Sequence, residues 1–255
     1  MINIDLSGRV AMVTGSSRGI GRAAALLLAK AGANLILNYK SDDEAGKQVV
    51  RDVEECGSQA ILVQCDVTDT DAVLAMVQVG IERFGKIDIL VNNAGGSIAK
   101  PADQLTDAEY DFVFDINVKA YVAAARTVLP QMKQRGWGRI ICISSVAGRS
   151  GKAFIGTSPA YAGAKGAVIA YSRSMARECG PFGITVNTIC PGWIDWEGKG
   201  RVVAPQLRAE AISQIPLQRV GNDADIAGAV IFLASDFASY ITGATVDVNG
   251  GLYMA

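Results

Sequence analysis

Histidine is absent from all 255 residues of the chain. Ser-His-Asp hydrolysis, a Cys-His nucleophile and imidazole-ligated zinc all need that side chain, so the sequence excludes these three kinds of site. Any proton transfer near neutral pH must instead use tyrosine, lysine, serine, a carboxylate or a cofactor. We expect no metal site.

Charge imbalance, cysteine pairs and long apolar runs are also scarce. The 24 basic and 25 acidic side chains nearly cancel, which argues against a nucleic-acid or membrane partner. The five cysteines form no C-x-x-C pair and are odd in number, so we expect reduced thiols. No apolar run approaches the ~18 residues of a membrane span, and the N-terminus does not resemble a secretion signal. These features favour a cytoplasmic protein that binds small molecules.

Short, continuously apolar segments recur along the chain. They are residues 10–14, 35–39, 61–65, 87–92, 139–144, 184–189 and 245–249. Segments long enough for helices separate them, such as 19–31. The alternation predicts an α/β fold with a doubly wound parallel sheet of about seven strands flanked by helices. No linker divides the chain, so we expect one domain over residues 1–255.

The least regular region is a loop at about 191–216, which contains two tryptophans and three glycines. A loop of this length in a compact domain is usually functional. It follows the carboxyl end of a strand, where open α/β sheets bind ligands. We therefore expect it to contact the substrate.

A glycine-rich turn, "VTGSSRGIGRA", joins the first strand to the first helix. Gly15, Gly19 and Gly21 let the backbone approach a pyrophosphate, and the helix N-terminus offers unpaired N–H groups. In this strand-turn-helix context the pattern predicts a dinucleotide-binding, Rossmann-like sheet.

Three motifs occur together in a particular order. The turn has the spacing T-G-x-x-x-G-x-G, "NNAG" follows at residues 92–95, and Tyr161 precedes Lys165 by four residues. Together they resemble the short-chain dehydrogenase/reductase family over practically the whole chain. The segments "NYKSDDEA" and "VNGGLYM" are most similar to its 3-oxoacyl-acyl-carrier-protein reductases. The resemblance implies an oxidoreductase that uses a nicotinamide cofactor.

The second strand ends in "LNYKSDD", which bears on the choice of cofactor. Asn38 is neutral where an acid would repel a 2′-phosphate, and Arg18, Lys40 and Ser41 can bind one. NADP(H) is therefore favoured over NAD(H), which two acids just downstream keep possible. The cofactor-binding residues implied by the resemblance are Gly15, Ser17, Arg18, Gly19, Ile20, Gly21, Asn38, Tyr39, Lys40, Ser41, Asp66, Val67, Asn93, Ala94, Gly95, Tyr161, Lys165, Pro191, Gly192 and Ile194.

Several of these residues also have a purely structural interpretation. Without the resemblance, "DVTD" at Asp66 is a helix cap and "NNAG" is a turn, while Arg18 and Lys40 are ordinary surface charges. Trp196 stands where a threonine is frequent in the family, which suggests a bulkier pocket edge.

Tyr161 and Lys165 share one face of a helix that begins near Ser158 and Pro159, because they are four residues apart. Such a pair is usually only a surface pair. As an acid or base near pH 7, the phenol needs its pKa lowered by about 3, or about 4 kcal/mol. One cation about 4 Å away gives a gross term of that order, so we expect Lys165 to lower the pKa of Tyr161.

The resemblance implies four catalytic residues: Asn117, Ser145, Tyr161 and Lys165. Ser145 would hold the substrate oxygen beside the Tyr161 hydroxyl, with Ser144 as the alternative serine. Asn117 resembles a proton-relay element, although polar helix filler is the rival interpretation. In the reductive direction hydride goes to a carbonyl carbon and Tyr161 protonates the oxygen.

Three functions remain open from the sequence. The first is NADP(H)-dependent reduction of a carbonyl, such as a 3-oxoacyl thioester linked to acyl carrier protein. The second is NAD(P)-dependent oxidation of a sugar, hydroxy acid or other secondary alcohol, and the third is a non-catalytic NADP-binding sensor or scaffold. An acidic carrier needs basic docking residues, for which Lys133, Arg135, Arg139 and Arg173 are candidates, whereas Phe182 replaces a residue that is commonly basic. The resemblance also implies a homotetramer with contacts around 103–134 and 158–179.

Overall fold

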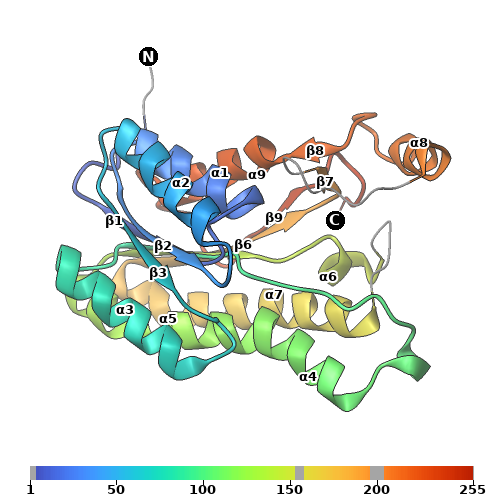
Figure 1. The fold of residues 1–255 in the computed structure, drawn as a ribbon, viewed down its shortest axis with the longest axis horizontal. Coiled ribbons are helices and arrows are strands. Elements are labelled where there is room, and N and C mark those ends of the chain that lie inside the picture. Colours follow the sequence, from blue (N-terminus) through green and yellow to red (C-terminus); the bar gives the residue numbers. More distant parts are fainter. Residues whose placement is uncertain (1–3, 153–157, 196–203, 255) are drawn as a thin grey trace.

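The structure is a computed structural model that describes residues 4–152, 158–195 and 204–254. Seven parallel strands form one sheet in the order β3-β2-β1-β4-β5-β6-β9 (Figure 1). They are β1 Val10–Val13, β2 Asn34–Tyr39, β3 Ala60–Gln64, β4 Ile89–Asn92, β5 Gly138–Ile143, β6 Ile184–Pro191 and β9 Thr245–Val248. Each corresponds to one of the seven apolar segments, so the predicted doubly wound sheet is confirmed.

Helices cover both faces of this sheet (Figure 1). One face carries α1 Gly19–Lys30, α2 Asp43–Glu55 and α9 Asp223–Ala234. The other carries α3 Thr70–Phe84, α5 Ala120–Arg135 and α7 Pro159–Cys179, with α4 Asp107–Phe114 packed against α7. Successive strand residues point to opposite faces: Met12 joins the core under α3, α5 and α7, whereas Ala11 and Val13 join the core under α1, α2 and α9.

Short elements complete the chain between these helices and strands. They are η1 Ala102–Gln104, the π-helical turn η2 Asp115–Lys119, α6 Ala147–Ser150, η3 Gly180–Phe182, β7 Ile194–Asp195, α8 Pro205–Ser213, β8 Gly221–Asn222 and η4 Asp236–Ala238. Among the described residues, no helix is long and apolar enough to cross a bilayer.

The helices begin where their capping residues stand. Asp69 accepts bonds from the first N–H groups of α3, and Thr106 forms a reciprocal capping box with Glu109 in α4. Ser158 caps α7 by accepting from the backbone of Tyr161, with Pro159 as the first helical residue. The predicted start of the Tyr161 helix is therefore confirmed.

Among the described residues, the region expected to be a loop over 191–216 contains regular secondary structure, which corrects that expectation. Strand β7 pairs with β8, and α8 begins at Pro205 because proline suits the first helical position. Arg208 of α8 pairs with Asp195 of β7, and its guanidinium lies 5.2 Å from the centre of the Trp193 ring. Trp196 lies outside the described residues.

Asn38 joins the carboxyl ends of three strands. Its side-chain oxygen accepts from the N–H of Gly15 at 2.9 Å. Its amide nitrogen donates to the carbonyls of Cys65, at 3.0 Å, and of Tyr39 and Val63. The side chain is 2% exposed, so these bonds replace water.

We predict that Asn38→Ala lowers the free energy of unfolding by about 3 kcal/mol, because it leaves buried donors and acceptors without partners. Urea denaturation measures this. Gln64→Ala is the control, since its amide bonds the Lys40 carbonyl at an exposed site of the same sheet edge and its loss should cost under about 0.5 kcal/mol. Equal losses in the two variants would contradict the structural role of Asn38.

Candidate active site

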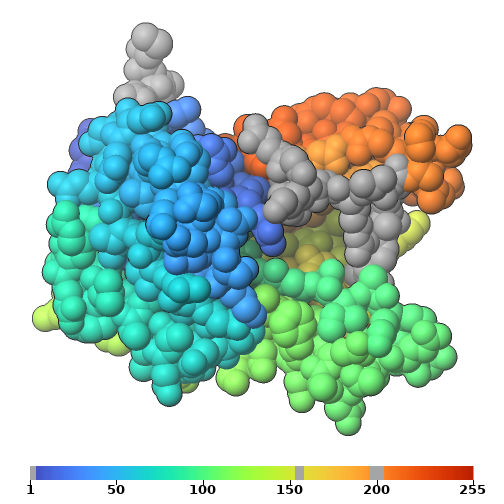
Figure 2. All heavy atoms as spheres, viewed as in Figure 1, coloured from blue at the N-terminus to red at the C-terminus, as the bar shows by residue number. Residues whose placement is uncertain are grey.

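A cleft of about 690 Å³ lies at the carboxyl ends of the strands. Figure 2 shows this face hollowed between the blue N-terminal residues, the green residues near position 100 and the orange C-terminal part. Every residue predicted from the sequence to bind cofactor or to act in catalysis lines it, except Gly21. The structure therefore brings together residues from six strand ends, although their roles stay predictions.

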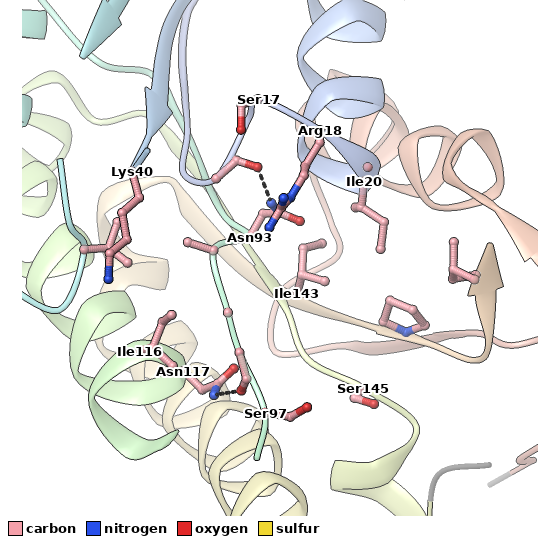
Figure 3. A pocket seen from close by; sticks show the side chains of 18 of the residues that line it. Ser17, Arg18, Ile20, Lys40, Asn93, Ser97, Ile116, Asn117, Ile143 and Ser145 are labelled. Carbon is pink, nitrogen blue, oxygen red and sulfur yellow. Dashed lines mark hydrogen bonds between the residues drawn. The ribbon is translucent and has the colours of Figure 1, made fainter. Parts of the chain in front are cut away.

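The glycine-rich turn is fixed to the end of β4 by one clamp. The Asn93 amide nitrogen donates to the carbonyls of Thr14 and Gly15 at 2.9 and 3.1 Å (Figure 3). In return, the Thr14 hydroxyl accepts from the backbone N–H groups of Asn93 and Ala94. The amide nitrogen of Asn93 thus shapes the turn.

The three glycines of the turn meet different requirements. Gly15 and Gly19 have φ of 63° and 56°, which other residues rarely adopt. Gly21 lies behind the cleft, and a Cβ there would come within 2.3 Å of the Gly15 carbonyl oxygen. Only glycine lets α1 start so close to the turn, and the N-terminus of α1 then suits a phosphate group.

Positive and negative side chains meet at the β2 edge of the cleft. Lys40 pairs with Asp66 at 2.6 Å. Burial alone would raise the pKa of Asp66, but hydrogen bonds from Lys40 and Thr68 lower it. The sequence allowed Asp66 to be either a capping residue or a cofactor-binding residue. Its carboxylate accepts a hydrogen bond from the Thr68 hydroxyl, as a capping residue does, and it also lines the cleft.

The acids that kept NAD(H) possible have other partners. Asp42 caps α2 by accepting from the Ala45 N–H. Asp43 accepts from the Tyr39 hydroxyl at 2.8 Å and pairs with Lys47 at 2.6 Å, and these hydrogen bonds lower the pKa of Asp43. Both carboxylates therefore bind groups of α2 or of the strand end just before it.

Figure 3 shows Ser145 at the opposite end of the cleft from Ser17 and Arg18, and Tyr161 also lines the cleft. Ser144, the alternative serine, donates its hydroxyl to the Lys165 carbonyl at 2.7 Å. Since that bond holds α7 against the end of β5, Ser145 is the serine that remains for a ligand. A hydrogen bond from Ser145 reaches the Tyr161 phenol.

Tyr161 departs from the expected titration behaviour. Burial raises its pKa above 10, and the Ser145 hydrogen bond offsets this only in part. Lys165 does not reverse this rise: its ammonium lies 5.8 Å from the ring centre and donates to the Ile143 carbonyl at 2.8 Å. The expected lowering of the Tyr161 pKa is therefore wrong for this arrangement of the two side chains.

Lys165 is 3% exposed, and burial lowers its pKa to about 8. Asn117 lies nearby in the π-helical turn, a form that often marks functional sites. Its amide donates to the Gly96 and Val113 carbonyls, and its buried side-chain oxygen has no partner within the described parts of the chain. That oxygen and the Lys165 nitrogen both face the space that a Cβ on Gly95 would fill.

The sequence analysis missed some residues that line the cleft. They include Asp42, Cys65, Gly96, Ser97, Ile116, Ile143 and Val146. Cys65 and Ile143 could have been found from their place at strand ends, whereas nothing local marks Ile116. Within the described ranges, no three His, Cys, Asp or Glu side chains are grouped to hold a metal ion.

The fold and the cleft define an NAD(P)-dependent oxidoreductase. The family model described as Enoyl-(Acyl carrier protein) reductase matches residues 15–253, and the chain belongs to the short-chain dehydrogenase/reductase family. The residues fit the cofactor, because Gly21 lets the N-terminus of α1 start close to the turn, where it suits a phosphate group, and the orphaned Asn117 oxygen offers an acceptor.

Three relatives illustrate this membership. The 3-oxoacyl-[acyl-carrier-protein] reductase FabG of Staphylococcus aureus strain Mu50 is 41% identical, with 96% of this chain and 98% of the relative aligned. FabG of Escherichia coli K12 is 38% identical over 98% and 100% of the two chains. A solved structure from Sinorhizobium meliloti 1021, described as a short-chain alcohol dehydrogenase, is 32% identical with a TM-score of 0.91 over 97% of each chain.

We predict that Lys165 makes stability rise with pH. Folding lowers the lysine pKa from 10.5 to about 8, so between these values the unfolded chain binds more protons. Relative to Lys165→Met, the wild type should therefore gain about 2 kcal/mol of unfolding free energy from pH 8 to pH 10. Urea denaturation of both proteins across this range measures the gain, and parallel curves would contradict a lowered pKa.

Proposed function

We propose that the chain uses NADPH to reduce a 3-oxoacyl thioester or a related ketone. The observation that carries this proposal is the cleft, which joins a phosphate-binding turn at one end to Ser145, Tyr161 and Lys165 at the other. The two FabG relatives, at 41% and 38% identity, support the substrate class.

When bound, the reduced nicotinamide supplies a hydride to the carbonyl carbon. Ser145 donates to the carbonyl oxygen and Tyr161 delivers the proton to it. The pKa of Tyr161, raised by burial, keeps the phenol protonated and thus suited to be an acid in the reductive direction. Lys165 would bind the cofactor ribose, and the unpartnered side-chain oxygen of Asn117 would hold a water that relays a proton to that lysine.

The substrate test compares wild type with Tyr161→Phe. With NADPH and a 3-oxoacyl thioester, we expect kcat to fall by about 10²-fold or more while NADPH still binds, because only proton delivery is lost. Absorbance of the reduced nicotinamide measures turnover. Tyr171→Phe is the control, since Tyr171 is an exposed tyrosine on the same helix.

Two results would count against this proposal. One is full activity in Tyr161→Phe, which would remove the phenol from the reaction. The other is turnover by the wild type with sugars and NAD but with no 3-oxoacyl thioester, which would favour the second candidate.

That second candidate is a dehydrogenase for another secondary alcohol, and the basic residues favour it. Arg139 is 3% exposed at the start of β5, away from the cleft, so it cannot dock a carrier protein and that expectation is wrong. Lys133 pairs with Glu178, and its ammonium lies 5.0 Å from the centre of the Phe182 ring. Phe182 is exposed, and it replaces a residue that is commonly basic in relatives that act on carrier proteins. These two positions therefore favour a substrate that is not linked to an acidic carrier, such as another secondary alcohol.

The preference for NADP(H) rests on Arg18, Lys40 and Ser41 at the rim of the cleft. Lys40 is exposed, and a 2′-phosphate would compete with Asp66 for its ammonium. The nearby acids Asp42 and Asp43 are occupied at the start of α2, which weakens their repulsion of phosphate.

We predict that Lys40→Ala raises KM for NADPH by about 10-fold to 100-fold, the worth of one charge-assisted hydrogen bond, and changes KM for NADH little. Initial rates with each cofactor measure the ratio. Lys30→Ala is the control, because this exposed lysine lies at the other end of α1 from the turn. Equal changes for both cofactors would contradict a phosphate contact.

The homotetramer stays a prediction. Its expected contact helices carry exposed apolar side chains, among them Tyr110 and Phe112 on α4 and Tyr171 on α7. An assembly along these helices would cover them.

A further inference from the structure

Tyr121 is a buried tyrosine that the proposed chemistry does not use. It lies in the first turn of α5, is 3% exposed, and packs within the core under α3, α5 and α7. A buried phenol needs a hydrogen-bond partner, and this one donates to the carbonyl of Ile143 at 3.0 Å. Ile143 is the last residue of β5 and lines the cleft.

The same carbonyl also accepts from Lys165. The Lys165 nitrogen lies 2.8 Å from the Ile143 oxygen, 3.4 Å from the Tyr121 hydroxyl and 5.1 Å from the centre of the Tyr121 ring. Since the phenol gives its proton to Ile143, its oxygen is left to accept from the ammonium. The ammonium therefore has two oxygen acceptors and an aromatic face on one side.

This arrangement leaves one of the three N–H groups of Lys165 for the cleft. We propose that Tyr121 is a positioning residue for Lys165: its hydroxyl holds the ammonium against the end of β5, keeps it charged, and directs its remaining N–H toward the ligand. The proposal rests on the proposed function for its effect on turnover, but not for its effect on Lys165 itself.

The groups around Lys165 explain why a neutral hydroxyl matters. The titratable side chains facing it are Tyr121 from α5, Tyr161 from its own helix, Cys142 from β5 and Cys190 from β6. Burial raises the pKa of each of these four groups, to about 11 for Cys190, so all are neutral near pH 8. Only dipoles and ring faces among these groups stabilise the ammonium, so the loss of one hydrogen-bond acceptor should lower the pKa of Lys165.

Tyr121→Phe tests the proposal because it keeps the ring and removes only the hydroxyl. In protein labelled with ¹⁵N at the lysine side chains, NMR titration gives the pKa of Lys165, whose signal is assigned by its loss in Lys165→Met. We expect this pKa to fall by about 1 in Tyr121→Phe, since a hydrogen bond to the charged form is lost.

Thr127→Val is the matched control. Its hydroxyl donates to the Ala123 carbonyl within α5 at 2.8 Å, so the variant loses a hydrogen bond of the same helix without touching Lys165. It should leave the Lys165 titration unchanged. An unchanged titration in Tyr121→Phe as well, with both variants folded by circular dichroism, would overturn the proposal.

Kinetics separate this inference from the proposed function. In Tyr121→Phe we expect kcat for thioester reduction to fall by about 10-fold with KM for the thioester little changed, and the pH dependence of NADPH binding, followed by fluorescence, to shift in parallel with the Lys165 titration. A shifted titration in a protein that reduces no carbonyl would refute the proposed function and support the role of Tyr121. Normal reduction with an unshifted titration would do the reverse.

Discussion

The site depends on one topological constraint: β1 and β4 are neighbours in the sheet, but the chain leaves them toward opposite faces. From β1 it turns into α1, and from β4 it runs to the side of α4 and α5. The two departing segments cannot cover the strand ends between them, so a crevice opens there. The mutual hydrogen bonds of Thr14 and Asn93 hold its two walls together.

Within this crevice, asparagine amides do much of the structural work. Asn38, Asn93 and Asn117 each bind backbone groups of segments that are distant in sequence. An amide can donate and accept without carrying charge, so it satisfies strand ends near a ligand at a lower desolvation cost than a carboxylate. Ionic side chains lie instead at the rim of the crevice, where Lys40 pairs with Asp66, and at the buried ammonium of Lys165.

That ammonium, on Lys165, has a pKa that burial moves toward neutral pH, whereas the sequence predicted that the phenol of Tyr161 would shift. Burial brings the pKa of the lysine down to about 8 while it raises that of Tyr161. Both pKa values stay above neutral pH, so the lysine and the phenol both hold their protons there. This state suits a reductive step, in which the phenol gives a proton away.

The sequence by itself determined the seven strands, the glycine-rich turn, the capped helix starts and the helix that carries both Tyr161 and Lys165. All of these follow from patterns within a few residues, such as apolar runs, glycine spacing and i, i+4 neighbours. It did not reveal that Arg139 is buried, that α8 forms in the irregular region, or that burial raises the pKa of Tyr161. Only the tertiary structure decided these points and brought Tyr121, Ile143 and Lys165 together, because the contacts join residues 22 and 44 positions apart and depend on how α5 and α7 pack on the sheet.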